Sequence, residues 1–511
     1  MDLNAQRERN AYDIFKRLRN RLRKLHPTEV VHYCIHQLNP GRSFTRKEML
    51  QQPPWFYFLI LKWVLVHGDF RSPNRRALRK PDMEEVLGML HELWGAVRLP
   101  NDYDSHYLFF RSTFQQQLWL QEDFLFTDLG RQSILFLNLP GEHSFRSAFH
   151  QAVGVELSAF LELSFALVGK FTVRDTGSVR EEFFESLSSS YPPGTISAFV
   201  SALSRDLESI GPELAKINPE RSVLYEFIEL TPLRRFPLLK IDERYFCYCN
   251  HLLYQTLQNF VYDVLREMDA NSFTNKFGPI FERYLEMGLS HASLTFLPES
   301  KLAKEMRSGS QLVDFAILTT DAAVLIDAKA VELSSLGMLA HRAEVVADRL
   351  KPSVLKAIGQ GFDVANQLRA TGRIEDSCPV FLLVVTYKDL LLGSGSDFYQ
   401  HVGLERIDQL SGKYGGVAPI PMEHIFFLSI NDFDLLMEHL RVSCTNLSDF
   451  LRTVVRRNSD FMTSSIVFRQ HIPDGITKRA FPQYLTAEFA RLGERLRVQL
   501  QQYERTLPKG E

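Results

Sequence analysis

The sequence has little cysteine and no long apolar run. Only five of its 511 residues are cysteine, an odd number without the dense spacing of a disulfide framework. The first 25 residues are charged throughout and lack the apolar region of a secretory signal. The most apolar run, Trp55–Val66, contains Lys62 and falls short of the roughly 20 residues of a membrane span. These absences argue against a disulfide-rich secreted protein and a helical membrane protein, and we expect a cytoplasmic chain.

The chain also lacks a strong net charge, but its charge is unevenly distributed. The total is −2, whereas residues 1–80 carry 17 Lys and Arg against 6 Asp and Glu, a net +11 that leaves −13 for the remainder. A basic end of this kind favours contact with nucleic acid or another acidic surface. A solvated basic helix face explains the same charges. No complete ATPase motif is present, because Gly393-Ser394-Gly395-Ser396 lacks the Lys-Ser/Thr of a phosphate-binding loop.

The composition, 45% hydrophobic and 23% charged, is that of a globular chain. Residues 1–250 have the spacing of an α-rich region, beginning with a basic amphipathic helix over 6–25. Residues 133–137 have a strand-like pattern. A β-hairpin is predicted to close this region, with strands over 238–241 and 244–249 around Asp242-Glu243.

From residue 251 the pattern changes to short apolar strands alternating with helices. This order predicts an α/β domain with a mixed sheet over residues 251–440, followed by a helical tail over 441–511. The expected helices cover residues 251–268, 272–290 and a long segment from 352, and the expected strands cover 294–297, 312–319, 323–330, 380–386 and 425–428.

The most informative stretch is Gln311–Ala330, in which two apolar strands meet at Thr320-Asp321. If those two residues form the turn of a hairpin, Asp314 lies directly opposite Asp327. Lys329 then lies two residues beyond Asp327, on the same face. A four-residue loop keeps this register, whereas a three-residue loop breaks it. The pattern therefore predicts two carboxylates and an amine on one face of a hairpin.

The other face of the same hairpin is apolar, so we expect both strands to be buried. It consists of Val313, Phe315, Ile317, Val324, Ile326 and Ala328. Buried Asp and Lys are almost always paired, and directly opposed like charges are destabilising. A divalent cation between the carboxylates removes that repulsion, and oxygen ligands suit Mg²⁺. The alternative is an ion-pair cluster of Lys329, Asp327 and Asp314 without chemistry, which leaves one net negative charge on a buried sheet.

This arrangement resembles the PD-(D/E)XK nuclease superfamily, whose signature is an acidic residue on one strand and (D/E)-x-Lys on the next. Val313-Asp314 followed by Asp327-Ala328-Lys329 matches it. The resemblance covers about residues 270–440. It implies a mixed-sheet, restriction-endonuclease-like core in an α/β chain, preceded by the α-rich N-terminal region and followed by the helical tail.

The family also places a glutamate on the helix before the first strand. Glu282 fits that position, and Glu286, one turn further on, is the competing choice. The helix after the lysine strand often carries basic or amide residues that face the site. Lys356 and Gln360 are four residues apart there and share a face, so the resemblance adds Gln360 to the catalytic residues. A solvated helix face explains both equally well, and Val364 stands where some branches have tyrosine.

The resemblance implies metal-dependent hydrolysis of phosphodiester bonds, with DNA as the expected substrate. Asp314, Asp327, the Ala328 carbonyl and Glu282 would bind Mg²⁺ or Mn²⁺, directly or through water. The metal would lower the pKa of a bound water and stabilise charge on the phosphate. Lys329 would orient the attacking water and help to neutralise charge in the transition state.

Two other functions fit the same residues. One is a non-catalytic protein that uses a nuclease-like core for assembly or nucleic-acid binding, and the other is an RNase. Cutting both strands at once needs two chains, so a homodimer is expected, and any nucleotide-driven activating partner would be a separate protein. Fusion of this core to a large unrelated region is typical of restriction, repair and anti-phage proteins, which is an analogy at the level of fold.

Overall fold

A computed structural model describes residues 3–39, 45–71, 75–96, 103–117, 120, 126–140, 143–172, 177–217, 223–307, 311–460, 462–473 and 481–506. The chain divides into two compact units. The first comprises Met1–Leu99, Thr113–Met268 and Ala487–Glu511, and the second comprises Pro100–Ser112 and Asp269–Thr486. This division is not linear along the chain, unlike the boundaries at residues 250 and 440 expected from the sequence. Local periodicity predicts helices and strands, but it cannot show that a compact unit is built from stretches that are far apart in the sequence.

The first unit is mainly helical. Helix α1 (Leu3–Leu22) buries Ile14 and Leu18 and exposes its charged residues, as its amphipathic spacing predicts. Helix α4 (Pro54–His67) is apolar on every side and is almost entirely buried, which explains its membrane-like composition. The other principal helices are α2 (Pro27–Leu38), α5 (Lys80–Trp94), α7 (Thr127–Gln132), α8 (Ser144–Val153), α9 (Leu157–Thr172), α11 (Thr195–Leu203), α12 (Ile210–Ile217) and α14 (Asn250–Met268).

The predicted hairpin of this unit is confirmed. Strands β3 (Leu238–Ile241) and β4 (Arg244–Cys247) pair in antiparallel fashion around Asp242, which adopts a positive φ of 53° that Asp tolerates better than most residues. Strands β1 (Ser178–Val179) and β2 (Ser204–Asp206) extend the sheet in the order β1-β4-β3-β2.

The strand-like interpretation of Ser133–Leu137 is wrong. These residues continue the helical path of α7 as a short π-helix, with Ser133, Leu135 and Phe136 buried. Periodicity cannot distinguish a short buried strand from a buried piece of helix, because both consist of consecutive apolar residues.

In the second unit, α15 (Ala270–His291) leads into a five-stranded sheet. Its strands are β5 (Leu297–Pro298), β6 (Phe315–Leu318), β7 (Ala323–Lys329), β8 (Val380–Thr386) and β9 (Ile425–Ser429). The sheet is mixed, as predicted: β5, β6 and β7 pair in antiparallel order, whereas β7, β8 and β9 are parallel. The strand expected over 294–297 is reduced to the two residues of β5.

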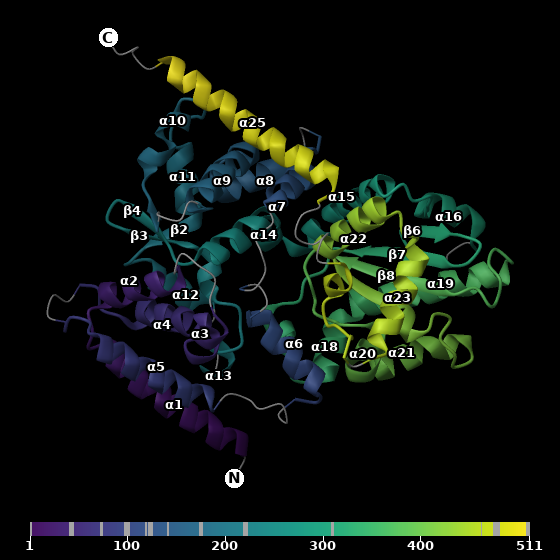
Figure 1. Cartoon of the computed structure of the whole chain (residues 1–511), viewed down its shortest axis with the longest axis horizontal. Helices are drawn as coiled ribbons and strands as arrows, with labels where there is room; N and C mark the ends of the chain where they lie inside the picture. The colour runs from purple at the N-terminus through teal and green to yellow at the C-terminus, as the bar shows by residue number, and fades with distance from the viewer. Residues whose placement is uncertain are drawn as a thin grey trace. The chain divides into compact units, whose positions relative to one another are not determined.

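Helices cover this sheet and explain its apolar composition. Every residue of β8 is buried, as expected for a central strand with parallel neighbours. Figure 1 shows β6, β7 and β8 side by side, with α22 and α19 beside them. The other helices of the unit include α16 (Glu299–Glu305), α17 (Ser335–Met338), α18 (Ala343–Leu350), α19 (Lys356–Ala370), α20 (Gly395–Phe398), α21 (Leu404–Ser411), α22 (Ile430–Ser443) and α23 (Leu447–Asn458), with the π-helix Lys351–Leu355 ahead of α19.

The C-terminal part is helical, as expected, and ends in α25 (Gln483–Thr506). Among the residues that the structure describes, no single helix is long and apolar enough to cross a bilayer. The bent pair α8 and α9 meets the length and composition of a broken span.

Candidate metal-dependent active site

The turn between β6 and β7 sets the register that brings the candidate residues together. Thr319 N donates to Ala322 O at 3.0 Å, so Thr320 and Asp321 form the two-residue turn. The ladder then pairs Phe315 with Ile326 and Leu318 with Ala323. This is the register predicted from the sequence, and its continuation places Asp314 opposite Asp327.

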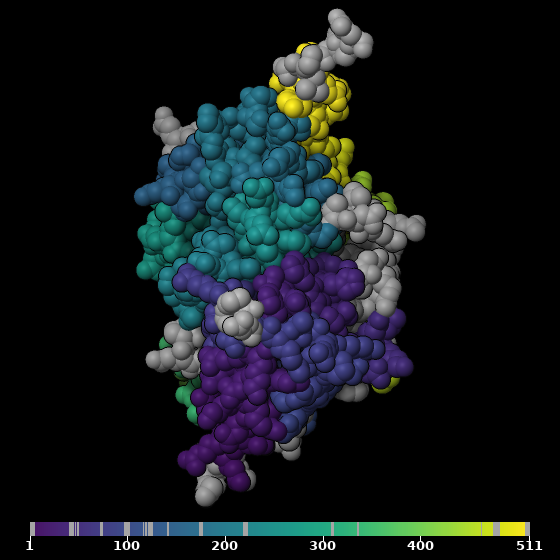
Figure 2. Space-filling view, turned by 90° about the vertical axis from the view of Figure 1, so that its left-hand side faces the viewer, coloured from purple at the N-terminus to yellow at the C-terminus, as the bar shows by residue number. Residues whose placement is uncertain are grey.

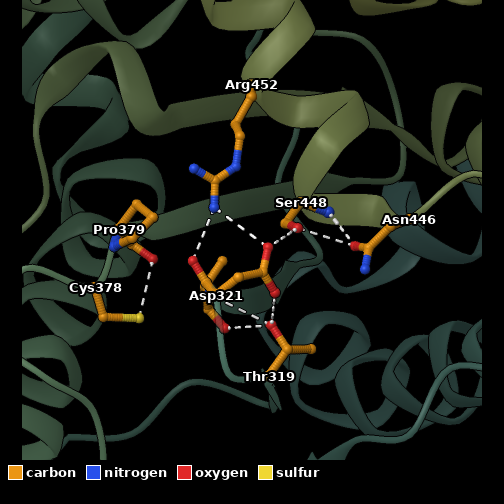
Figure 3. Close-up of polar contacts among 8 residues, drawn as sticks. Thr319, Asp321, Cys378, Pro379, Asn446, Ser448 and Arg452 are labelled. Carbon is orange, nitrogen blue, oxygen red and sulfur yellow. Dashed lines mark hydrogen bonds and ion pairs between the residues drawn. The ribbon is translucent and has the colours of Figure 1, made fainter.

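The turn is fixed by a dense set of polar contacts (Figure 3). Thr319 Oγ1 donates to Asp321 Oδ1 at 2.7 Å, and Ser448 Oγ donates to Asp321 Oδ2 at 2.9 Å. Arg452 Nη2 donates to the Asp321 carbonyl at 2.8 Å. Helix α23 thereby anchors the turn, and a slip of one residue would break all of these bonds and move every side chain to the other face.

Asp314 and Asp327 meet at the opposite end of the hairpin. Asp314 directly precedes β6, and its Oδ2 accepts a hydrogen bond from Ala328 N at 2.5 Å. Asp327 is 0% exposed within β7, and its Oδ1 has no hydrogen-bond donor in the described part of the chain. A buried carboxylate oxygen without a donor is costly, so it needs an explanation.

Lys329 is the cation of this cluster. Its ammonium forms an ion pair with Asp327 Oδ2 and donates to Gln360 Oε1 at 3.1 Å. Gln360 in turn donates through Nε2 to the carbonyl of Leu312, the residue two positions before Asp314. The amide of Gln360 is therefore oriented from both ends, and α19 is tied to both hairpin strands at the cluster.

Glu282, on α15, belongs to the same group, whereas Glu286 does not. Glu282 is half-buried, and the charges of Asp314 and Lys329 both act on it; Glu286 is exposed. Of the two candidates weighed from the sequence, the structure places Glu282 beside the hairpin carboxylates. Lys356 is exposed, but its charge acts on Asp327, so it also lies on the side of α19 that faces the cluster.

The carboxyl groups of the cluster resist ionisation. Burial, followed by the negative charges of Asp314 and Glu299, raises the pKa of Glu282 to about 7. Burial, followed by the charge of Asp327, raises the pKa of Asp314 to about 7. Burial also raises the pKa of Asp327, against the opposing effect of Lys329. The charges of Lys329 and Lys356 do not offset these upward shifts in pKa, and a further cation would.

Glu299 is a carboxylate that sequence reasoning missed. It is the first residue of α16, its backbone N–H donates to the Asp314 carbonyl at 2.8 Å, and its charge raises the pKa of Asp314 and Glu282. Pro298-Glu299 is an ordinary helix start, so the only signal in the sequence was that of a helix boundary.

The donor set fits Mg²⁺ or Mn²⁺. Within the described ranges, no group of three or more His, Cys, Asp or Glu side chains is already arranged around a metal position. Mg²⁺, however, typically takes one or two carboxylates and keeps several waters. Asp314 and Asp327, with the undonated Asp327 Oδ1, and the adjacent Ala328 carbonyl could supply these ligands, and Glu282 is close enough for the charge of Asp314 to raise its pKa.

The basic N-terminal region is partly neutralised within the first unit. Its residues lie at the surface (purple in Figure 2), but many pair with nearby carboxylates, several of them on α5. The pairs are Arg17–Glu92, Arg21–Asp82, Arg71–Glu208, Arg75–Asp69, Arg76–Asp82 and Lys80–Glu84. Arg9 and Lys16 remain exposed on α1 with no ion pair among the described residues. The basic face is therefore smaller than the composition of residues 1–80 indicates.

Comparison of the chain with protein-family models, with curated proteins and with solved structures found no match.

Proposed function

We propose that this chain is a metal-dependent nuclease of the PD-(D/E)XK type, whose catalytic core is the mixed sheet β6–β9 with α15 and α19. One observation carries the proposal. Asp314, Asp327 and Lys329 converge on one end of a hairpin whose register is fixed at the other end, and Asp327 Oδ1 is buried there without a donor.

Asp314, Asp327 and the Ala328 carbonyl would hold Mg²⁺ or Mn²⁺, with Glu282 as a further ligand, directly or through water. The metal supplies a water of lowered pKa and stabilises charge on the phosphate. The reaction adds one water across a P–O bond, so the products are a phosphate monoester end and a free hydroxyl end. The protein residues position these reactants and exclude competing geometries.

Lys329 acts on the attacking water and on the phosphate. Its ammonium is held between Asp327 Oδ2 and Gln360 Oε1, so its direction is defined before substrate binds. If Asp327 held a metal ion, Lys329 would share that carboxylate with it, and the ammonium would have hydrogens left to donate to the water and to a phosphate oxygen. Gln360 is a positioning residue, since it reaches Lys329 and not the reacting atoms.

DNA is the substrate that we propose, in restriction or anti-phage defence, with a homodimer to cut both strands and a separate protein that stimulates the basal activity of the chain. The same site fits RNA. The non-catalytic alternative is supported by one observation, the internal pairing of Lys329 with Asp327. The two functions are distinguished by metal dependence, because only a metal site would cleave substrate when Mg²⁺ or Mn²⁺ is added.

The test is incubation of the purified chain with supercoiled plasmid and with a structured RNA, each in Mg²⁺, in Mn²⁺ and in EDTA. We expect nicked or linear DNA in either metal and none in EDTA. Cleavage of RNA alone would assign an RNase. Cleavage of neither substrate in either metal would contradict the proposal and favour the non-catalytic alternative.

A further inference from the structure

Two loops border the end of the sheet at which the candidate site lies. Strands β7 and β8 are parallel and pair as far as Lys329 with Thr386, so the loops that follow them leave the sheet at the same edge. These loops are residues 330–342, which include the one-turn helix α17 (Ser335–Met338), and residues 387–394. The two loops are joined by an ion pair between Lys388 Nζ and Glu332 Oε1 at 3.0 Å. Both loops therefore begin beside the end of β7 that carries Lys329.

A short segment from an earlier part of the chain holds both loops. The segment Tyr103–Ser112, at the start of α6 (His106–Gln117), belongs to the second unit, although the chain on either side of it belongs to the first. Asp104 Oδ2 accepts from the first amide of α18, Ala343 N, at 2.8 Å. Tyr107 donates through its hydroxyl to Leu391 O at 3.3 Å and stacks on His401 at 5.3 Å between ring centroids.

Arg111 makes the central contacts of this segment. Its side chain is 0% exposed, and Nη1 donates to the carbonyls of Gly337 at 3.2 Å and Met338 at 2.9 Å, in the loop after β7. Its Nε donates to the carbonyl of Leu390 at 3.2 Å, in the loop after β8. One guanidinium thus crosslinks the two loops through their backbone carbonyls, and its Nη2 also contacts the sulfur of Met338 at 3.2 Å.

Burial of the Arg111 side chain has a cost in folding free energy. Arg111 has no ion pair with a carboxylate within the described ranges, although the charge of Asp389 acts on it. A buried cation held mainly by carbonyls costs more than an apolar side chain of the same size. Only the guanidinium fork can donate to carbonyls on two sides at fixed angles, which a lysine ammonium cannot do. Leu391, the next residue in the second loop, has a positive φ of 52°, so this loop is held in a conformation that it would rarely adopt alone.

We infer that Arg111 is a positioning residue for the nuclease site, and that the segment Tyr103–Ser112 clamps the loops after β7 and β8 in the arrangement that cleavage requires. This inference rests on the proposed function. Loops are mobile unless they are tethered, and displacement of a catalytic group by about 1 Å costs roughly 10²-fold in rate.

The experiment compares Arg111→Lys with the matched control Arg131→Lys in the full chain. Arg131 is also buried, but it belongs to the first unit and pairs with Asp128 there. Plasmid cleavage is measured for kcat and KM, and hydrogen exchange is followed in residues 333–343 and 387–394 without DNA. We expect Arg111→Lys to lower kcat by about 10²-fold with little change in KM and to speed exchange in both loops. The control should do neither, even where its melting temperature falls as far.

A milder variant covers the case in which Arg111→Lys does not fold. Tyr107→Phe removes only the hydroxyl that donates to Leu391 O and keeps the aromatic ring, and we expect it to lower kcat several-fold and to speed exchange in residues 387–394 alone. Wild-type kcat in a folded Arg111→Lys, or in Tyr107→Phe with a loosened loop, overturns the inference and leaves the proposed function intact. Absence of cleavage by the wild-type chain overturns the proposed function itself.

Discussion

The two ends of the β6–β7 hairpin use aspartate in opposite ways. At the turn, both carboxylate oxygens of Asp321 accept hydrogen bonds, and those from Thr319 and Ser448 lower its pKa. At the open end, burial raises the pKa of both Asp314 and Asp327, and Asp327 Oδ1 accepts no bond in the described structure. The contacts at the turn stabilise the fold, whereas the buried carboxylates at the open end destabilise it when they are ionised.

We take this difference as support for the proposed role of Asp327, although an open oxygen alone does not assign a role, because Asp432 Oδ1 is also buried without a donor in the described structure. A carboxylate that serves stability is surrounded by donors, because an unmade bond costs roughly 1–3 kcal/mol. A carboxylate that binds metal must leave an oxygen open. The hairpin links the two, since the satisfied turn fixes the register that holds the unsatisfied end in place.

The largest effect on cleavage is expected from substitution of the charged residues at the open end of the hairpin. We expect Asp327→Ala or Lys329→Ala to reduce plasmid cleavage by about 10³-fold, because each removes a group that acts on the reacting water or on its metal. Circular dichroism should show an unchanged fold. Asp321→Ala, assayed below its melting temperature, should cleave at close to the wild-type rate. Full activity in Asp327→Ala or in Lys329→Ala would remove these residues from the mechanism.

A smaller loss is expected on α15. Glu282→Gln should lower cleavage by about 10²-fold, since it removes a charged group beside the metal position and keeps the shape of the side chain. Glu286→Gln, one turn further on, is the control and should have no effect, because Glu286 is exposed. Equal activity of the two variants would show that Glu282 takes no part.

The two ends should also respond differently to pH. Asp314 and Glu282 have folded-state pKa values of about 7, above those of the unfolded chain. Their contribution to stability is therefore present below pH 4 and is lost as the pH rises through 7. Without metal, we expect the melting temperature to fall between pH 5.5 and pH 8 because of these groups. Addition of about 5 mM Mg²⁺ should raise the melting temperature more at pH 8 than at pH 5.5. A metal effect independent of pH would contradict this.

The smallest effect is a change in stability of opposite sign at the two ends. In EDTA at pH 8, Asp314→Asn should raise the melting temperature, because it removes a repelled charge and can still accept from Ala328 N. Asp321→Ala should lower stability by about 1 kcal/mol through lost hydrogen bonds. Thermal unfolding measures both. If Asp314→Asn is also destabilising, the open end is an ordinary ion-pair cluster.

Much of the second unit could be predicted from the sequence. Strand β8 begins and ends as expected, and the register of the hairpin follows from alternation and a two-residue turn, both of which are local properties. The contact between Lys329 and Gln360 is consistent with helical spacing and with the family resemblance. These features depend on residues that are close in sequence or on a repeated pattern.

Other features depend on long-range packing and were missed. Ser133–Leu137 is helical because it continues a helix within a buried region, and its apolar run alone could not show this. Glu299 joins the carboxylates because α16 starts beside Asp314. Arg111 bonds to backbone carbonyls more than 220 positions away, which no side-chain pattern encodes. The assembly of each unit from non-consecutive stretches of the chain also depends on long-range packing.

The most direct test of the central claim is a calorimetric titration of Mn²⁺ into the purified chain at pH 8. The open carboxylate oxygen of Asp327 is proposed to be a metal ligand, so the wild-type chain and Asp321→Ala should both bind Mn²⁺, and Asp327→Ala should lose that binding. Equal binding by Asp327→Ala and the wild-type chain, or no binding by the wild-type chain, would contradict the claim.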